Sequence, residues 1–148
     1  MSELYNLYQK VGNEGYGDAI GQIAPYFSTI HPRFVELRPG YCEILIKNQK
    51  SVHNHIGTMH AIAICNGAEL VAGVMTDISI PDNHRWIPIG MTVAYTALAD
   101  TDIRVVADGS DIDWSILGEL VVPVVACKPD GSEVFNARIT MKISQKKA

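Results

Sequence analysis

Hydrophobic residues in the first part of the chain recur at helical spacing until glycines interrupt them. Leu4, Leu7 and Val11 lie three or four positions apart, which predicts a helical segment over residues 1–28. Glycines at positions 12, 15 and 17 fall in its middle, so we expect the segment to be broken there. Asp18 follows them and is expected to cap a second short helix.

From residue 30 the pattern changes to the alternation of half-buried strands. The turn signal Arg38-Pro39-Gly40 separates two such runs, at 34–37 and 41–47, and predicts a hairpin. A second hairpin is expected around the turn at 128–131, and residues 108–116 read as an irregular connection. The later strand-like runs are expected to form an antiparallel meander, and they cover residues 87–98, 103–107, 118–127 and 133–144.

Residues 58–74 have the composition of a buried helix, because they carry Glu69 as their only charged residue. A surface helix would show a charged face, so this one must be enclosed, and a curved sheet is the economical wrapper. We therefore expect one α+β domain over residues 1–148, in which helices at 1–28 precede a core at 30–145. In that core an antiparallel sheet wraps one long central helix. Its exposed edge strand would pair with a second copy, which predicts a two-fold dimer.

Composition excludes several classes of protein. With 47% hydrophobic and 19% charged residues, the chain is a folded globular protein. A net charge of −4 with scattered cations argues against binding to nucleic acid. Three cysteines without a CxxC spacing favour reduced thiols in the cytoplasm. The chain shows no signal-peptide pattern, and its apolar runs are shorter than the about 20 residues of a membrane span, so we expect no membrane partner.

The segment that leads into the buried helix carries the chemistry. An asparagine, a glycine, a histidine and the lone acid occupy it, namely Asn54, Gly57, His60 and Glu69. In this pattern the chain resembles the hotdog-fold thioesterases, in particular the phenylacetate-pathway acyl-CoA thioesterases and related thioesterase-like proteins. Those proteins have an Asn, then G-x-x-H-G-G at the start of the central helix, and an acid eight positions after the first glycine of HGG. Ala61 and Ile62 replace the two glycines here. The resemblance covers roughly residues 50–145.

The resemblance implies a hotdog fold and hydrolysis of acyl-CoA or acyl carrier protein thioesters, without a cofactor, by a homodimer or a dimer of dimers. Glu69 would be the base or nucleophile and the Ala61 N–H the oxyanion donor, with help from Asn54 and His60. These residue types suit the reaction. Negative charge develops on the thioester oxygen, where an N–H at a helix N-terminus stabilises it, and a carboxylate must attack or activate water.

Helix geometry adds a constraint of its own. Ala61 and Glu69 are eight residues apart, which separates them by about 12 Å along a helix axis. One thioester carbon cannot lie about 3 Å from both. Two antiparallel copies of the helix would bring Glu69 of one chain to Ala61 of the other, so we expect a site shared between subunits and an inactive monomer.

The substrate-binding residues are expected on the helix and the strand after it. Gly57, Ile62, Met91, Thr92 and Tyr95 would contact the substrate, with the acyl chain between helix and sheet of the dimer. Cations at 85 and 142 are candidates for the phosphates of the nucleotide. Relatives carry a Ser, Thr or Asp beside the catalytic water, at the position that aligns with residue 88, a proline here. Thr92 is the substitute candidate.

Simpler interpretations stand beside these roles. Glu69 can be a structural carboxylate, His60 can bond a loop carbonyl, and Asn54 can be a turn residue. The histidines at 53, 55 and 60 suggest a zinc site, but no acidic partner lies at a familiar spacing, so we expect no metal. Cys65 favours packing over nucleophilic chemistry because no base accompanies it in the pattern.

Two other functions remain open. A hotdog protein can bind acyl thioesters without hydrolysing them, as a sensor or carrier, and the missing glycines and hydroxyl favour that function. The fold also hosts hydratases and dehydratases, whose differently spaced motif is not found here.

Overall fold

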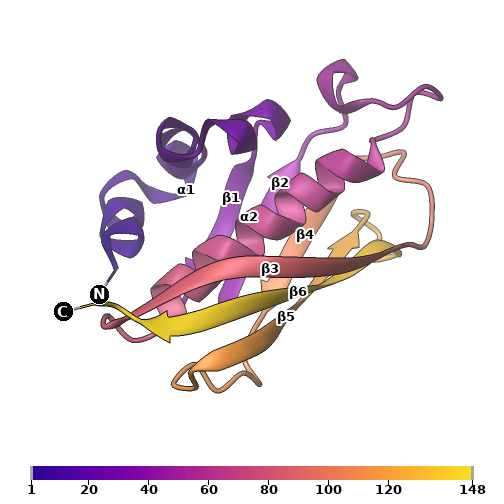
Figure 1. The fold of residues 1–148 in the computed structure, drawn as a ribbon. Coiled ribbons are helices and arrows are strands. Elements are labelled where there is room, and N and C mark those ends of the chain that lie inside the picture. The colour runs from indigo at the N-terminus through magenta and orange to yellow at the C-terminus, as the bar shows by residue number, and fades with distance from the viewer. Residues whose placement is uncertain (1, 148) are drawn as a thin grey trace.

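The computed structural model describes residues 2–147. One antiparallel sheet of six strands curves around a long helix, and two helical segments precede it (Figure 1). The strand order is β1-β2-β4-β5-β6-β3. The elements are α1 (Glu3–Ile23), η1 (Pro25–Ile30), β1 (Arg33–Arg38), β2 (Tyr41–Ile46), η2 (Lys50–Val52), α2 (Ala61–Ser79), β3 (His84–Tyr95), β4 (Ile103–Asp108), β5 (Gly118–Cys127) and β6 (Glu133–Gln145), where η marks a 3₁₀ helix. This is the hotdog arrangement, and the predicted α+β class is confirmed.

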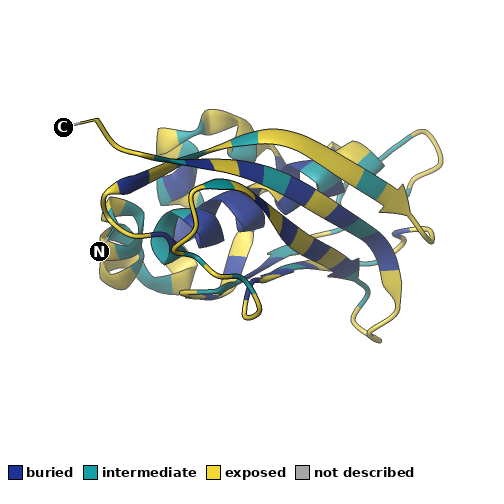
Figure 2. Ribbon diagram, turned by 60° about the horizontal axis from the view of Figure 1, so that its bottom comes forward, coloured by how far each residue is buried: buried dark blue, intermediate teal, exposed yellow. Residues whose placement is uncertain are grey.

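The core lies between α2 and the concave face of the sheet. Along β5 and β6 buried and exposed residues alternate, so one face of each strand packs on the helix (Figure 2). Most of α2 is buried from Ile64 to Thr76, as its uniform apolar composition requires. Among the described residues, α2 is the one helix with the length and composition of a membrane span, and 72% of that stretch is buried inside the fold. Burial under the sheet explains its hydrophobicity.

The N-terminal segment is broken at one glycine. Gly12 has a φ of 67°, outside the helical region, whereas the other glycines of α1 stay helical. The predicted break is therefore confirmed, but the predicted cap at Asp18 is wrong, because Asp18 lies inside α1 and Ser2 caps it. Gly17 serves a close approach, since a Cβ there would lie 2.2 Å from the backbone oxygen of Pro32.

Two other expectations need correction. The central helix begins at Ala61 rather than 58, because Met59 N–H bonds to Ala99 O and His60 N–H to Val52 O, which hold these residues extended. It also runs on to Ser79. The later strands do not form a simple meander, because β3 pairs with β6 and the chain then crosses to place β4 beside β2.

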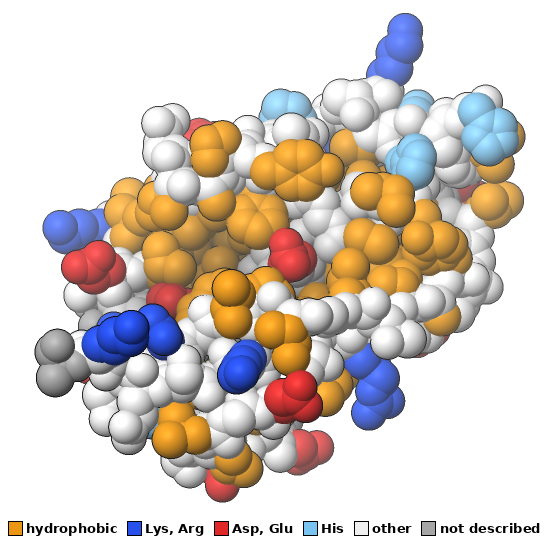
Figure 3. Space-filling model, viewed as in Figure 1, with side chains coloured by type: hydrophobic (Ala, Val, Ile, Leu, Met, Phe, Trp, Pro, Cys, Tyr) orange, Lys and Arg blue, Asp and Glu red, His pale blue; other side chains and the backbone are white. Residues whose placement is uncertain are grey.

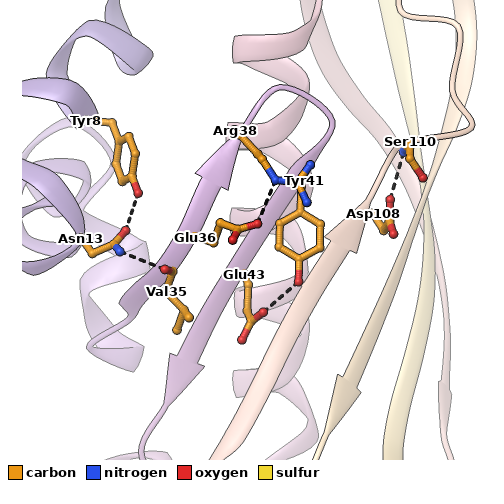
Figure 4. Close-up of polar contacts among 9 residues, drawn as sticks. All are labelled: Tyr8, Asn13, Val35, Glu36, Arg38, Tyr41, Glu43, Asp108 and Ser110. Carbon is orange, nitrogen blue, oxygen red and sulfur yellow. Dashed lines mark hydrogen bonds and ion pairs between the residues drawn. The ribbon is translucent and has the colours of Figure 1, made fainter.

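The two edges of the sheet differ in how they are protected. Edge strand β1 has a bulge between Phe34 and Glu36, and Asn13 Nδ2 donates to Val35 O at 2.9 Å (Figure 4). Tyr8 in turn holds the Asn13 side chain. Edge strand β3 has no such contact on its outer edge within residues 2–147, so this edge is open to pairing with a second chain.

Candidate functional site at the central helix

The loop before α2 is closed by Asn54. Its Oδ1 accepts hydrogen bonds from the N–H groups of Ile56 and Thr58, and its Nδ2 donates to Thr58 Oγ1 at 2.8 Å. Gly57 has a φ of 81°, a left-handed conformation that favours glycine. These contacts use both polar atoms of the Asn54 amide inside the loop. Asn54 and Gly57 therefore shape the approach to the helix.

The first turn of α2 leaves one N–H group free. His60 is the N-cap, and its Nδ1 accepts from Ile62 N–H at 3.1 Å. The N–H groups of Ala63 and Ile64 bond to the His60 carbonyl. The N–H of Ala61 has no acceptor in the part of the chain that the structure describes. The Ala61 N–H, which the resemblance names as the oxyanion donor, is therefore the N–H of this turn that remains available within the described residues.

Glu69 lies two turns further along the same helix. Its side chain is exposed and makes no hydrogen bond or ion pair within residues 2–147. It lines a groove of about 220 Å³ that is otherwise almost entirely apolar. On the face viewed in Figure 3, hydrophobic side chains gather along α2 between α1 and β3, and the surface is hollowed there. The carboxylate therefore stands unpaired within residues 2–147, accessible to solvent and beside apolar surface.

The walls of this groove come from three elements. α1 and η1 contribute Ile20, Phe27 and their neighbours, and β3 contributes Trp86 and Pro88. Pro88, the position at which the sequence resemblance implies a hydroxyl or carboxyl residue, lines the same groove as Glu69. Position 88 and Glu69 thus share one groove, and the residue at position 88 here has no hydroxyl.

The concave side of β3 extends the apolar surface past Glu69 toward the helix start. Met91 and Tyr95 pair with Ile139 and Phe135, two buried residues of the concave face, yet they are 40% and 59% exposed. Ile62, on α2, is 52% exposed. Large apolar side chains this open on a folded domain indicate a surface that another molecule covers.

Thr92 lies on the other side of β3. It alternates with Met91 and Val93 and pairs with the exposed Arg138, so its side chain projects from the convex face. Within one protomer the geometry does not bring Thr92 to Glu69.

Cys65 lies beside the hydroxyl of Tyr95 across this surface. Burial raises the pKa of the Cys65 thiol, and the hydrogen bond with Tyr95 lowers it in part. A thiol with a raised pKa is a poor nucleophile near neutral pH. The position therefore fits packing, in agreement with the absence of a base beside it in the sequence pattern.

The histidines before α2 have separate partners. His53 Nε2 is 2.8 Å from Asn48 Oδ1, and His60 caps the helix. Among the described residues no group of three or more His, Cys, Asp or Glu side chains is arranged to hold a metal ion.

Arg85 and Lys142 lie on neighbouring strands. Arg85 pairs with Ser144 and Lys142 with Ile87, which makes the two cations diagonal neighbours on β3 and β6. Both side chains are exposed. Lys142 also lies opposite Glu119 of β5, and neither Arg85 nor Lys142 takes part in the ion pairs that occupy Arg38, Arg104 and Lys128.

Sequence reasoning did not identify the wall that α1 and η1 build over α2. Asn66 ties η1 to α2, since its Nδ2 donates to Tyr26 O and to Thr29 Oγ1. The sequence feature that could have predicted this wall was Asn66 itself, a polar residue inside a largely apolar helix. Gly73 was a second such feature, because a Cβ there would lie 2.9 Å from the Trp86 ring.

Comparison with known proteins supports the fold. A family model described as a domain of unknown function, DUF4442, matches residues 12–143. The genomics protein APC5556 is 59% identical, with 97% of each chain covered and a TM-score of 0.89. PA5026 from Pseudomonas aeruginosa, described as a protein of unknown function and probable thioesterase, is 22% identical over 87% of this chain and 93% of its own, with a TM-score of 0.79. The thioesterase HI1161 from Haemophilus influenzae is 9% identical over 87% and 90%, with a TM-score of 0.75. No curated protein matches the chain. The hotdog thioesterase-like resemblance is confirmed at the level of the fold.

Proposed function

The chain belongs to the DUF4442 family, and from that premise we propose that it hydrolyses acyl thioesters of coenzyme A or of an acyl carrier protein. The observation that carries the proposal is the pair of unsatisfied groups on α2. The Ala61 N–H is a free donor at a helix N-terminus, and Glu69 is a free carboxylate beside an apolar groove. A thioester hydrolase needs both kinds of group. The names of two structural neighbours, a thioesterase and a probable thioesterase, agree with this activity.

The site requires two chains. Along α2 the two groups are about 12 Å apart, so one protomer does not hold both at a single carbonyl. The open edge of β3 and the exposed apolar side chains of Ile62, Met91 and Tyr95 favour a homodimer, through a two-fold axis at this edge. The two α2 helices would then run antiparallel, with Glu69 opposite the partner's Ala61.

In the proposed reaction Glu69 takes a proton from a water molecule, and the oxygen of that water attacks the thioester carbon. The negative charge that develops on the carbonyl oxygen is stabilised by the N–H of the partner's Ala61 and by the helix dipole. The tetrahedral intermediate then expels the thiolate, which takes the proton back from Glu69. The products are the free acid and the free thiol. Direct attack by Glu69 is the second route open to the same residue.

The remaining site residues position the groups that react. Asn54 and Gly57 shape the loop, and His60 caps the helix by accepting from the Ile62 N–H, which leaves the Ala61 N–H without an acceptor in the described residues. The shared face is lined by Ile62, Met91 and Tyr95. The expected contact of Thr92 with the substrate is not proposed, because its side chain lies on the convex face of β3. Arg85 and Lys142 are proposed to meet the phosphates of the nucleotide. The protein is proposed to act in the cytoplasm without a cofactor, as a dimer or a dimer of dimers.

Binding without hydrolysis is the second candidate, and two observations favour it. Pro88 has no hydroxyl to hold a water beside Glu69, and the half-exposed Ile62 side chain stands next to the donor. Both features weaken catalysis without weakening the affinity of the groove for an acyl group.

The two candidates differ in thiol release. We expect the wild-type protein to release free thiol from acyl-CoA esters and Glu69→Gln to lose this turnover while it still binds the esters. Gln keeps the shape of Glu but cannot accept the proton. Tight binding without turnover by either protein would overturn the hydrolase and establish the binder. An exposed acid on α1, outside the proposed site, gives the matched control, Glu14→Gln.

A further inference from the structure

We infer that the groove between α1, η1 and α2 holds the acyl group, and that its far end restricts the substrate to compact apolar acyl groups. The inference rests on the proposed function, since Glu69 at the edge of the groove sets where the thioester lies. It places the acyl tail inside one protomer, behind Glu69, rather than along the shared face of Ile62, Met91 and Tyr95.

The composition of the groove suits an uncharged chain. Apart from Glu69, its lining is aliphatic or aromatic, and it includes Ile20, Ala24, Phe27, Val74 and Trp86. A polar or charged acyl group would lose its hydration there without gaining a partner. An apolar group gains about 0.8 kcal/mol for each methylene that it buries, which is roughly a fourfold gain in affinity or in kcat/KM.

The volume sets the size of the acyl group. A cavity of about 150 Å³ is enough for a benzene ring. In proportion, the groove of about 220 Å³ accommodates about nine carbon atoms. A phenylacyl group or a medium-length chain therefore fills it, whereas an acetyl group leaves most of it empty.

The far end of the groove is closed by a fixed aromatic ring. Trp86 Nε1 donates to Asp77 Oδ1 at 2.8 Å, and its ring lies directly on Gly73. Beyond Trp86 lies a separate cleft of about 780 Å³ whose lining includes Glu3, Asp77 and Lys146. A longer apolar tail would have to displace the Trp86 ring and enter this charged cleft, which costs free energy. Added methylenes beyond the ring should bring no further gain.

The experiment is an acyl-CoA series from acetyl to palmitoyl, with phenylacetyl-CoA added. For the wild type we expect kcat/KM to rise about fourfold per methylene until the groove is full, and then to level off or fall. Ala24→Phe places a ring in the groove, and we expect at least a roughly tenfold loss for octanoyl-CoA with acetyl-CoA little changed. Phe27→Ala enlarges the groove and should move the optimum to longer chains. Gln22→Phe adds the same ring to an exposed position of α1 and is the matched control.

Direct binding separates this inference from the proposed function. Calorimetry with the Glu69→Gln protein and the same acyl-CoA esters should show the same dependence on chain length. If affinity depends on chain length in this way but the wild type shows no turnover, the proposed hydrolase is refuted and the inference that the groove holds the acyl group stands. A chain-length profile that Ala24→Phe and Phe27→Ala leave unchanged, in proteins that melt like the wild type, would overturn the inference. A chain-length profile that Met91→Ala shifts, but Ala24→Phe and Phe27→Ala do not, would also overturn the inference.

Discussion

Ala61→Pro tests the proposed oxyanion donor without disturbing the helix. Proline removes the N–H of residue 61, and that N–H has no acceptor in the described chain, so no hydrogen bond of the fold is lost. Position 61 is the first of α2, where proline is well tolerated. The preceding residue also permits it, because His60 has a ψ of 133°, inside the range that a following proline requires.

The expected magnitudes follow from these facts. Loss of one oxyanion donor costs about 2.7–4 kcal/mol of transition-state stabilisation, which is a 10²- to 10³-fold decrease in kcat. The free energy of unfolding should stay the same or rise by less than about 1 kcal/mol, because proline restricts the unfolded chain. For a chain of this length, that corresponds to a shift in Tm of about 2–4 °C or less.

The assay is thiol release from an acyl-CoA ester that the wild type hydrolyses, together with calorimetric melting. Ala61→Gly is the matched variant, because it keeps the N–H and restores the first glycine of the HGG pattern. We expect Ala61→Gly to keep at least the activity of the wild type. If Ala61→Pro is folded and retains kcat within a factor of two, the Ala61 N–H is not the donor and the reasoning is refuted.

Three further outcomes are expected. Pro88→Ser adds a hydroxyl in the groove of Glu69, and one new hydrogen bond to the attacking water should raise kcat roughly three- to tenfold; an unchanged kcat would show that position 88 does not reach the water. Met91→Lys places like charges across the proposed two-fold axis, so sedimentation velocity should show a monomer without activity, while an active dimer would contradict the β3 interface. Burial raises the pKa of the thiols of Cys42 and Cys65, so both should alkylate slowly at pH 7, and Cys42, which is fully buried, should react only on unfolding. The alkylation rate of Cys65 should rise with pH, and at each pH it should be higher in the Met91→Lys monomer than in the wild type. Equal rates in the two proteins would count against a covered shared face.

The sequence predicted the central helix because its composition leaves no polar face to meet water. It could not predict the ends of that helix, since hydrogen bonds from the distant residues Val52 and Ala99 hold His60 and Met59 extended. In α1 the break at Gly12 was predictable from glycine, but the role of Gly17 depends on where the chain near residue 32 packs. The partner of β3 was also beyond reach, because strand pairing between distant segments leaves no local pattern.

For the candidate site, the motif positions were predictable from spacing and the groove was not. The structure places His60 and Ala61 at the start of α2 and Glu69 two turns later, as the spacing requires. The acyl groove exists only because α1 and η1 fold back over α2, and the side chains that build it are ordinary core residues in sequence. Their function comes from their position beside Glu69.

The claim that the site is shared between subunits is tested most directly by mixing two inactive variants. Glu69→Gln keeps an intact Ala61, and Ala61→Pro keeps an intact Glu69. In a shared site, each mixed dimer contains one site with both intact groups, so random exchange of equal amounts should restore about a quarter of the wild-type activity. If the mixture stays as inactive as its components after exchange, the two groups do not act across the dimer and the proposed mechanism is wrong.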